Sequence, residues 1–174
     1  MSTAARRAIA RPITFGFNDF SKFVFSDTSQ IGLDKRTCTL RLLKGTDGYY
    51  PTTTGIYARG PLLYPRALRG WTAYGDQRST PKNVNGDQVT SVKYRMNNGT
   101  IDLWWSGSAW AAPGATDWNT LAEIQANIAT FPVTTKKGRP VWNLATTDGT
   151  LTPSISRAAV AFAADVPGWD EEAL

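Results

Sequence analysis

The stretch RMNNGTIDLWWSGSAW, residues 95–110, holds the residues best suited to binding chemistry. If its segment IDLWW is a strand, side chains alternate between two faces, so that Ile101, Leu103 and Trp105 share the face expected to belong to the core and Asp102 and Trp104 share the other. A tryptophan can fill a sandwich core, support a sugar ring or anchor a contact with another protein. We expect Trp105 in the core. Asp102 and Trp104 are predicted to belong to a subunit interface or to a glycan platform.

The residue types that are missing restrict the chemistry further. The chain contains no histidine, which excludes Ser-His-Asp and Cys-His catalysis and the commonest zinc and non-haem iron sites. Cys38 is the only cysteine, so an intrachain disulfide is excluded. The alternation of TCTLRLL predicts that Cys38 is a buried structural thiol.

The carboxylates suggest no catalytic pair. A glycosidase needs two carboxyl groups roughly 5–10 Å apart, whereas most aspartates here occupy positions typical of turns and caps. Asp76, Asp87 and Asp148 could also offer loop oxygens to Ca²⁺, but no DxDxDG-type run supports this and ordinary turn chemistry explains them. The sequence therefore predicts no enzymatic activity, no metal site and no cofactor.

Charge is unevenly distributed along the chain, although the total is only +5. Residues 1–100 carry 15 Lys/Arg against 6 Asp, and residues 101–174 carry 4 Lys/Arg against 8 Asp/Glu. We interpret residues 1–12 as a basic N-terminal arm and residues 164–174 as an acidic C-terminal tail that contact neighbouring subunits. The residues assigned to these assembly arms are Arg6, Arg7, Arg11, Asp170, Glu171 and Glu172.

Two classes of partner are not expected. No run of basic residues is longer than two, which argues against a nucleic-acid partner. No apolar run approaches the roughly 20 residues that span a bilayer, which argues against membrane insertion. The chain is therefore expected to act on other proteins, or on a glycan.

Most segments that position these residues read as short strands. Residues 89–112 predict a three-stranded meander, in which Asn98-Gly99 favours a type I′ turn with positive φ at both residues. A further strand is predicted at 37–43, an irregular crossing with one helical turn at 56–70, and a surface loop at 75–87. The segments RPVWNLATTD and SISRAAVAF alternate and are predicted to pair with each other as an antiparallel hairpin.

One helix is predicted within TDWNTLAEIQANIATFP. Thr120 and Glu123 have the spacing of a capping box, and Leu121, Ile124 and Ile128 form one apolar stripe. A single short helix among many strands predicts an all-β, antiparallel, jelly-roll-like sandwich with one short α-helix. We expect residues 13–163 to form one such domain.

The order of these elements resembles β-sandwich modules in virion structural proteins of tailed bacteriophages. Such modules carry a strand of the YWDGSAW type, a short helix that opens with Trp-Asn, and a closing hairpin with TTD…TP at its turn. The resemblance covers about residues 89–163, and residues 1–88 contribute no match. The matching positions are Trp105, Gly107, Trp110, Trp118, Asn119, Thr147, Asp148, Thr152 and Pro153.

The resemblance implies a structural virion component of the tail, baseplate or neck, assembled in the host bacterial cytoplasm. Its partners would be further copies of itself and other virion proteins. The sandwich is also similar to concanavalin-like and laminin-G-like jelly rolls of sugar-binding proteins. A carbohydrate-binding module for host surface glycan and a capsid decoration (cement) protein therefore stand as alternatives.

Overall fold

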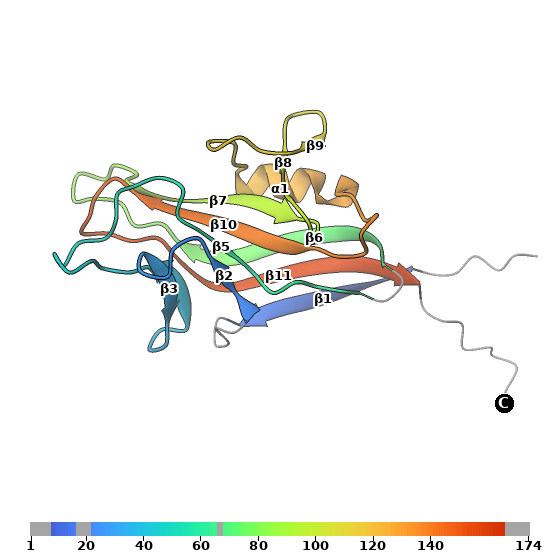
Figure 1. Ribbon diagram of the computed structural model, residues 1–174, viewed down its shortest axis with the longest axis horizontal. Helices are drawn as coiled ribbons and strands as arrows, with labels where there is room; N and C mark the ends of the chain where they lie inside the picture. Colours follow the sequence, from blue (N-terminus) through green and yellow to red (C-terminus); the bar gives the residue numbers. More distant parts are fainter. Residues whose placement is uncertain (1–7, 17–21, 66–67, 166–174) are drawn as a thin grey trace, which may run out of the picture.

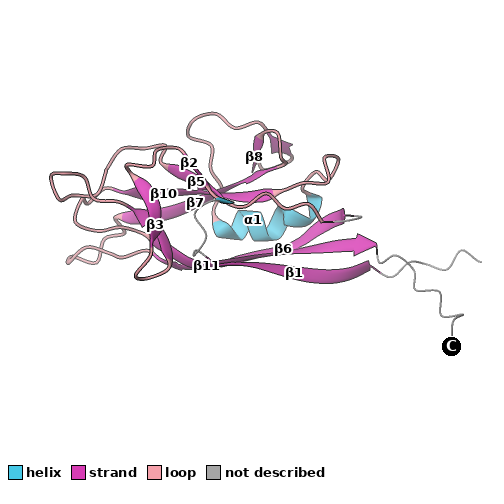
Figure 2. Ribbon diagram, turned by 60° about the horizontal axis from the view of Figure 1, so that its bottom comes forward, coloured by secondary structure: helices cyan, strands magenta, loops and turns pink. Residues whose placement is uncertain are grey.

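The computed structural model describes residues 8–16, 22–65 and 68–165. Two antiparallel sheets pack face to face, and one short helix lies between them at one side (Figures 1 and 2). This arrangement confirms the predicted all-β sandwich with one helix. Within the described residues, no helix has the length and apolar character needed to cross a bilayer.

The first sheet is built around one long central strand, β11. β6 pairs with one edge of β11, and β1 and β4 pair with successive parts of the other edge. β3 then continues the sheet beyond β4. The strands are β1 (Ala8–Gly16), β3 (Ile31–Asp34), β4 (Thr39–Leu42), β6 (Leu68–Ser79) and β11 (Ser154–Asp165).

The second sheet has six strands in the order β2-β5-β10-β7-β8-β9. Its β7, β8 and β9 follow one another along the chain, as predicted for the meander of residues 89–112. The strands are β2 (Val24–Phe25), β5 (Tyr57–Arg59), β7 (Thr90–Asn97), β8 (Asp102–Trp105), β9 (Trp110–Ala111) and β10 (Arg139–Thr146).

The prediction that residues 139–148 and 154–162 pair with each other is wrong. β10 lies between β5 and β7 in the second sheet, whereas β11 lies between β6 and the β1/β4 edge of the first. The link from 147 to 153 is long enough to cross the roughly 10 Å between stacked sheets. Alternation shows which side chains point inward, but it does not choose the neighbouring strand.

The helix α1 (Leu121–Asn127) and the 3₁₀ turn η2 (Ile128–Thr130) fill the space between β6 and β7 (Figure 2). The predicted capping box is confirmed, because the Thr120 hydroxyl accepts from the Glu123 N–H and the Glu123 carboxylate accepts from the Thr120 N–H. Ile124 and Ile128 are fully buried. The Gln125 side chain also donates to the Tyr74 carbonyl of β6, which ties the helix to the first sheet.

Buried side chains from both sheets and the helix form one core. Trp71 and Phe162 of the first sheet meet edge to face with ring centroids 6.1 Å apart. Trp142 of the second sheet donates to the Tyr74 hydroxyl of the first at 2.5 Å. The core therefore joins the two sheets through both apolar contact and a buried hydrogen bond.

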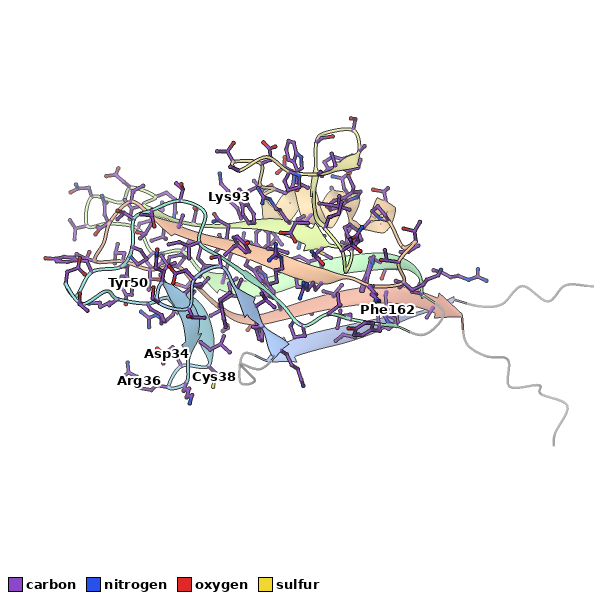
Figure 3. All side chains as sticks on the ribbon, in the orientation of Figure 1. Asp34, Arg36, Cys38, Tyr50, Lys93 and Phe162 are labelled. Carbon is purple, nitrogen blue, oxygen red and sulfur yellow. The ribbon has the colours of Figure 1, made fainter. Side chains whose placement is uncertain are left out.

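Cys38 is exposed, which contradicts the prediction of a buried thiol. It stands in the turn between β3 and β4 with a positive φ of 52°, at the tip of that hairpin (Figure 3). The pattern TCTLRLL misled because the strand begins only at Thr39. The preceding residues belong to a turn in which the Asp34 carboxylate accepts from the Arg36 N–H at 2.9 Å.

The hairpin at Asn98-Gly99 is confirmed, but its turn is not of type I′. Only Gly99 has a positive φ, at 94°. Asn98 instead closes a four-residue loop by a backbone bond from its N–H to the Ile101 carbonyl at 3.1 Å. Ile101 is therefore outside the strand and 47 % exposed rather than in the core.

Several predicted boundaries differ from those of the structure. β6 extends through Ser79, so part of the predicted loop at 75–87 is strand, and the predicted crossing at 56–70 contains β5 and the start of β6. β1 begins at Ala8, so the end of the predicted basic arm belongs to the sheet. The sequence of the segment GWTAYGD favours a short strand, and only the polar, exposed end of β6 at residues 77–79 is predicted as a loop.

Candidate functional site

The candidate site is the outer face of the second sheet, which turns away from the core. Residues that stand opposite each other across neighbouring strands share a face. Val141 of β10 lies opposite Arg59 on one side and Arg95 on the other. Two residues before Val141, and on the same face of β10, Arg139 lies opposite Asn97 of β7. The sheet therefore gathers three arginines that are far apart in the sequence.

Asp102, predicted to contribute to a binding platform, is held by protein groups on this face. Asn97 stands opposite Asp102 in the ladder and donates to its carboxylate at 2.6 Å. Arg59 donates from Nε at 2.9 Å and from Nη2 at 2.7 Å, a bidentate pair. Only 11 % of the Asp102 side chain is exposed. Its geometry is that of a buried counter-charge, with most of its acceptor positions used.

Trp104 shares this face with Asp102 and is half-buried. It lies opposite Ala111 of the short strand β9. In the part of the chain that the structure describes, its ring stacks on no aromatic ring or cation. Its assignment to an interface or platform therefore stays a prediction.

Trp105 is half-buried at the sheet edge rather than in the core. Its ring meets Trp110 at 6.0 Å, and Trp110 in turn meets Phe131 at 5.0 Å. The buried side chain of Asn119 accepts from the Trp105 N–H at 2.8 Å and donates to its carbonyl at 2.9 Å. Asn119 thus completes the edge of β8 as a strand would, a role that the sequence did not reveal.

Arg95 holds the loop of residues 114–118 against the outer face by hydrogen bonds. Its guanidinium donates to the carbonyls of Asp117 at 2.7 Å and Gly114 at 2.6 Å and lies 3.7 Å from the centre of the Trp118 ring. Arg95 is only 8 % exposed. Burial lowers the pKa of Arg95, and the negative charges of Asp102 and Asp117 offset this only in part. Arg95 therefore has a structural role and little free surface.

Arg139 differs because it forms no ion pair with a carboxylate of the described residues, although the charge of Asp102 acts on it from a distance. Its one described hydrogen bond runs from Nε to the Asn97 carboxamide oxygen at 3.4 Å, and that oxygen already accepts from the Gly99 N–H at 2.8 Å. Burial lowers the pKa of Arg139, and the like charge of Arg59 lowers it further. Among the described residues, Asp102 is the only carboxylate that forms an ion pair with any of the three arginines, and it pairs with Arg59.

Lys137 and Tyr64 form an exposed rim beside Arg139. Lys137 is exposed, and its ammonium group lies 5.5 Å from the centre of the Tyr64 ring. Tyr64 itself is 65 % exposed. The rim thus adds a second cation and an accessible aromatic ring beside the Arg139 guanidinium.

A second polar cluster lies inside the sandwich. Arg78 donates to the Tyr94 hydroxyl at 2.7 Å and lies 3.4 Å from the Asp76 carboxylate, which also accepts from Tyr74 at 3.3 Å. Burial raises the pKa of Asp76, and the hydrogen bonds and the Arg78 charge offset this only in part. Burial likewise raises the pKa of Tyr94 above its usual value. This cluster joins the two sheets, and its Asp76 carboxylate is buried, whereas the Arg78 side chain is 34 % exposed.

The aspartates weighed for Ca²⁺ do not come together. The described residues contain no group of three or more His, Cys, Asp or Glu side chains placed to hold a metal. Asp148 accepts from the Thr150 N–H at 2.9 Å, and Asp87 accepts from the Asn83 amide at 2.9 Å. Both make the local bonds expected of turn residues.

Two hollows flank Tyr50 at one end of the sandwich, with volumes of about 420 and 380 Å³ (Figure 3 labels Tyr50). Arg41 and Lys44 lie over the Tyr50 ring, 5.5 and 5.3 Å from its centre, and Arg41 also bonds the Tyr50 hydroxyl. Tyr49 lines one hollow and is 55 % exposed. This end offers an accessible aromatic side chain among polar groups.

The residues assigned to the assembly arms fall mostly outside the described ranges. This applies to Arg6, Arg7, Asp170, Glu171 and Glu172. Arg11 belongs to β1, where it stands opposite Phe162, but its side chain is not among those described.

Comparison of the chain with models of protein families, with curated proteins and with solved structures finds no match.

Proposed function

We propose that this chain is a structural component of a bacteriophage virion, of the tail, baseplate or neck, that acts through multi-copy protein–protein assembly. Its partners are further copies of itself and other virion proteins, and it assembles in the host bacterial cytoplasm. The supporting observation is the pairing of Ala8 with Asp165 in the β1–β11 ladder. The basic and the acidic segment of the sequence are thereby attached side by side at one end of the sandwich.

Opposite charges on two adjacent segments suit contacts between unlike surfaces of neighbouring subunits, which close into a ring when the rotation between subunits allows it. Exposed ion pairs contribute only about 0–1 kcal/mol each and are screened by salt. On this proposal apolar burial supplies most of the affinity, and the charged segments adjust register and partner choice.

The test is the mass of the full chain in solution, measured by light scattering across a salt series. We expect a discrete oligomer at low salt that loses mass as salt is raised. The variant Arg6→Gln/Arg7→Gln should weaken assembly without touching β1, which starts at Ala8. Arg157→Gln, a change on the exposed part of β11, serves as the matched control. A monomer at every salt concentration would refute self-assembly.

A glycan-binding function is the second candidate, favoured by the exposed Tyr49 at the hollow beside Tyr50 and by the half-buried Trp104. Aromatic side chains with polar neighbours are suited to stacking against sugar rings. Titration of the chain with bacterial surface oligosaccharides would show a change in tryptophan fluorescence if Trp104 is the platform. That change should vanish in Trp104→Ala, whereas Tyr49→Ala would abolish binding if the hollow is the site.

Capsid decoration is the same kind of structural role at another place in the virion. Recovery of the chain with isolated heads rather than tails would support it. The light-scattering measurement of self-assembly does not depend on whether the chain belongs to the tail, baseplate or neck or to the capsid.

A further inference from the structure

We propose that the face around Arg139 is the docking site for the acidic segment Asp170–Glu172 of the same chain. The docking concerns one chain and does not depend on the function proposed above.

The first support is the unbalanced charge of the face. Arg139 is half-buried and makes one long hydrogen bond to an amide oxygen, while the carboxylate of Asp102 is taken by Arg59 and Asn97. A partly buried guanidinium gains most from a carboxylate, which can accept two parallel hydrogen bonds. Lys137 adds a second positive charge at the rim.

The second support is the chemistry of the segment. Its sequence reads Trp169 followed by three consecutive acidic residues, the densest run of negative charge in the chain. The exposed Tyr64 ring beside Lys137 offers an aromatic surface for an indole next to the carboxylate site. The acidic and aromatic residues of the segment therefore match the cationic and aromatic side chains of the face around Arg139.

The third support is location. Lys136 donates from Nζ to the Leu68 carbonyl at 3.0 Å, and Leu68 is paired with Ala164, next to the last residue of β11. The turn that leads into Arg139 thus lies beside the end of β11. Figure 1 shows β10 starting and β11 ending at the same end of the sandwich.

The segment is long enough to reach the face. An extended chain covers about 3.3–3.6 Å per residue, so the five residues from Asp165 to Asp170 span up to about 17 Å. Stacked sheets lie about 10 Å apart. The reach of the segment exceeds this spacing, so a segment that starts at β11 can pass around the end of the sandwich toward the outer face of the second sheet, where Arg139 lies.

The test is disulfide trapping in the full-length chain, with Cys38→Ser as background. The pair Thr100→Cys and Ala173→Cys reports docking at the Arg139 face, because Thr100 is exposed and follows Gly99, whose Cβ position lies 2.9 Å from the Lys137 side chain. The pair Arg69→Cys and Ala173→Cys is the matched control, because Arg69 is exposed and lies closer to the end of β11. An undocked segment would meet residue 69 at least as often as residue 100.

We expect the Thr100→Cys pair to form an intramolecular disulfide at least tenfold faster than the Arg69→Cys pair in dilute protein at low salt. Arg139→Glu should remove this advantage, and Glu171→Lys/Glu172→Lys added to Arg139→Glu should restore it. Equal rates for the two pairs, or no effect of Arg139→Glu in a variant with unchanged circular dichroism, would overturn the proposal. A disulfide that forms only between two chains would assign the face to a neighbour's segment and also overturn it.

Light scattering separates this inference from the proposed function. Trapping in a chain that is monomeric at all salt concentrations supports docking and refutes self-assembly. An oligomer without trapping refutes docking and leaves the structural function standing.

Discussion

Asp102 and Asp76 show how the same side chain acquires opposite properties at two places in the sandwich. Burial raises the pKa of Asp102, but hydrogen bonds from Arg59 and Asn97 and the nearby positive charges outweigh it, so the pKa lies below the usual value. Burial dominates at Asp76, and its pKa lies above the usual value. The charge of Asp102 therefore stabilises the fold, whereas the charge of Asp76 opposes it.

Asp102→Asn is expected to lower the free energy of unfolding at pH 7 by about 1–3 kcal/mol, because Arg59 loses its charged partner. The depressed pKa means that this stabilisation is present above the unfolded-state pKa and is lost as the pH falls through the folded-state pKa. The deficit of the variant should thus shrink toward pH 3, as measured by urea unfolding from pH 7 to pH 3.

Asp76→Asn is the comparison with the opposite sign. Because the folded-state pKa of Asp76 is raised, the wild-type protein gains stability from this group as the pH falls. The stability of Asp76→Asn relative to wild type should therefore decline toward low pH. Parallel pH profiles for the two variants would contradict the assigned directions.

Small residues set the spacing between elements where the two sheets meet. A Cβ atom on Gly138, just before β10, would lie 2.5 Å from the Trp71 side chain of β6. A Cβ on Gly60, just after β5, would lie 2.9 Å from the Trp142 ring. Both tryptophans are at most 1 % exposed, so neither ring has room to move away. The close approach of the turn and the tryptophan requires glycine at position 138.

Gly138→Ala is expected to cost about 1–3 kcal/mol of unfolding free energy, because an overpacked core has to shift. Gly70→Ala in β6 is the matched control, since a Cβ there meets nothing within 4 Å, and it should change stability by less than about 0.5 kcal/mol. Chemical denaturation of both variants, followed by circular dichroism, measures the difference. Similar effects of the two substitutions would rule out Trp71 as the cause.

At the scale of the whole molecule, one core is shared by both sheets and the helix. The Trp142–Tyr74 hydrogen bond crosses between the sheets, and Ile124 of α1 is fully buried against them. The helix is too short to be stable alone, so its formation depends on this packing. The described residues therefore have the contacts of a single cooperative unit.

Unfolding should accordingly proceed in one transition. We expect the denaturation curves from tryptophan fluorescence and from far-ultraviolet circular dichroism to coincide. Ile124→Ala should lower the free energy of unfolding by about 2–5 kcal/mol and shift both curves together. Two separate transitions, or a shift in one signal only, would show that the sheets or the helix fold independently.

The sequence by itself determined the local features. The capping box of Thr120 and Glu123 and the meander of residues 89–112 depend on residues close in the chain. Their alternation and capping chemistry are complete within about ten residues, so they could be predicted without knowing the fold. The absence of histidine likewise restricted the chemistry of any site directly.

Only the tertiary structure decided which distant segments became neighbours. The pairing partners of β10 and β11, and with them the gathering of Arg59, Arg95 and Arg139 on one face, depend on strand order and register. Alternation is compatible with many strand orders, because every inward-facing strand has the same pattern. The order is selected by packing across the whole core, where Trp71 fits against Gly138 and the helix closes the gap between β6 and β7.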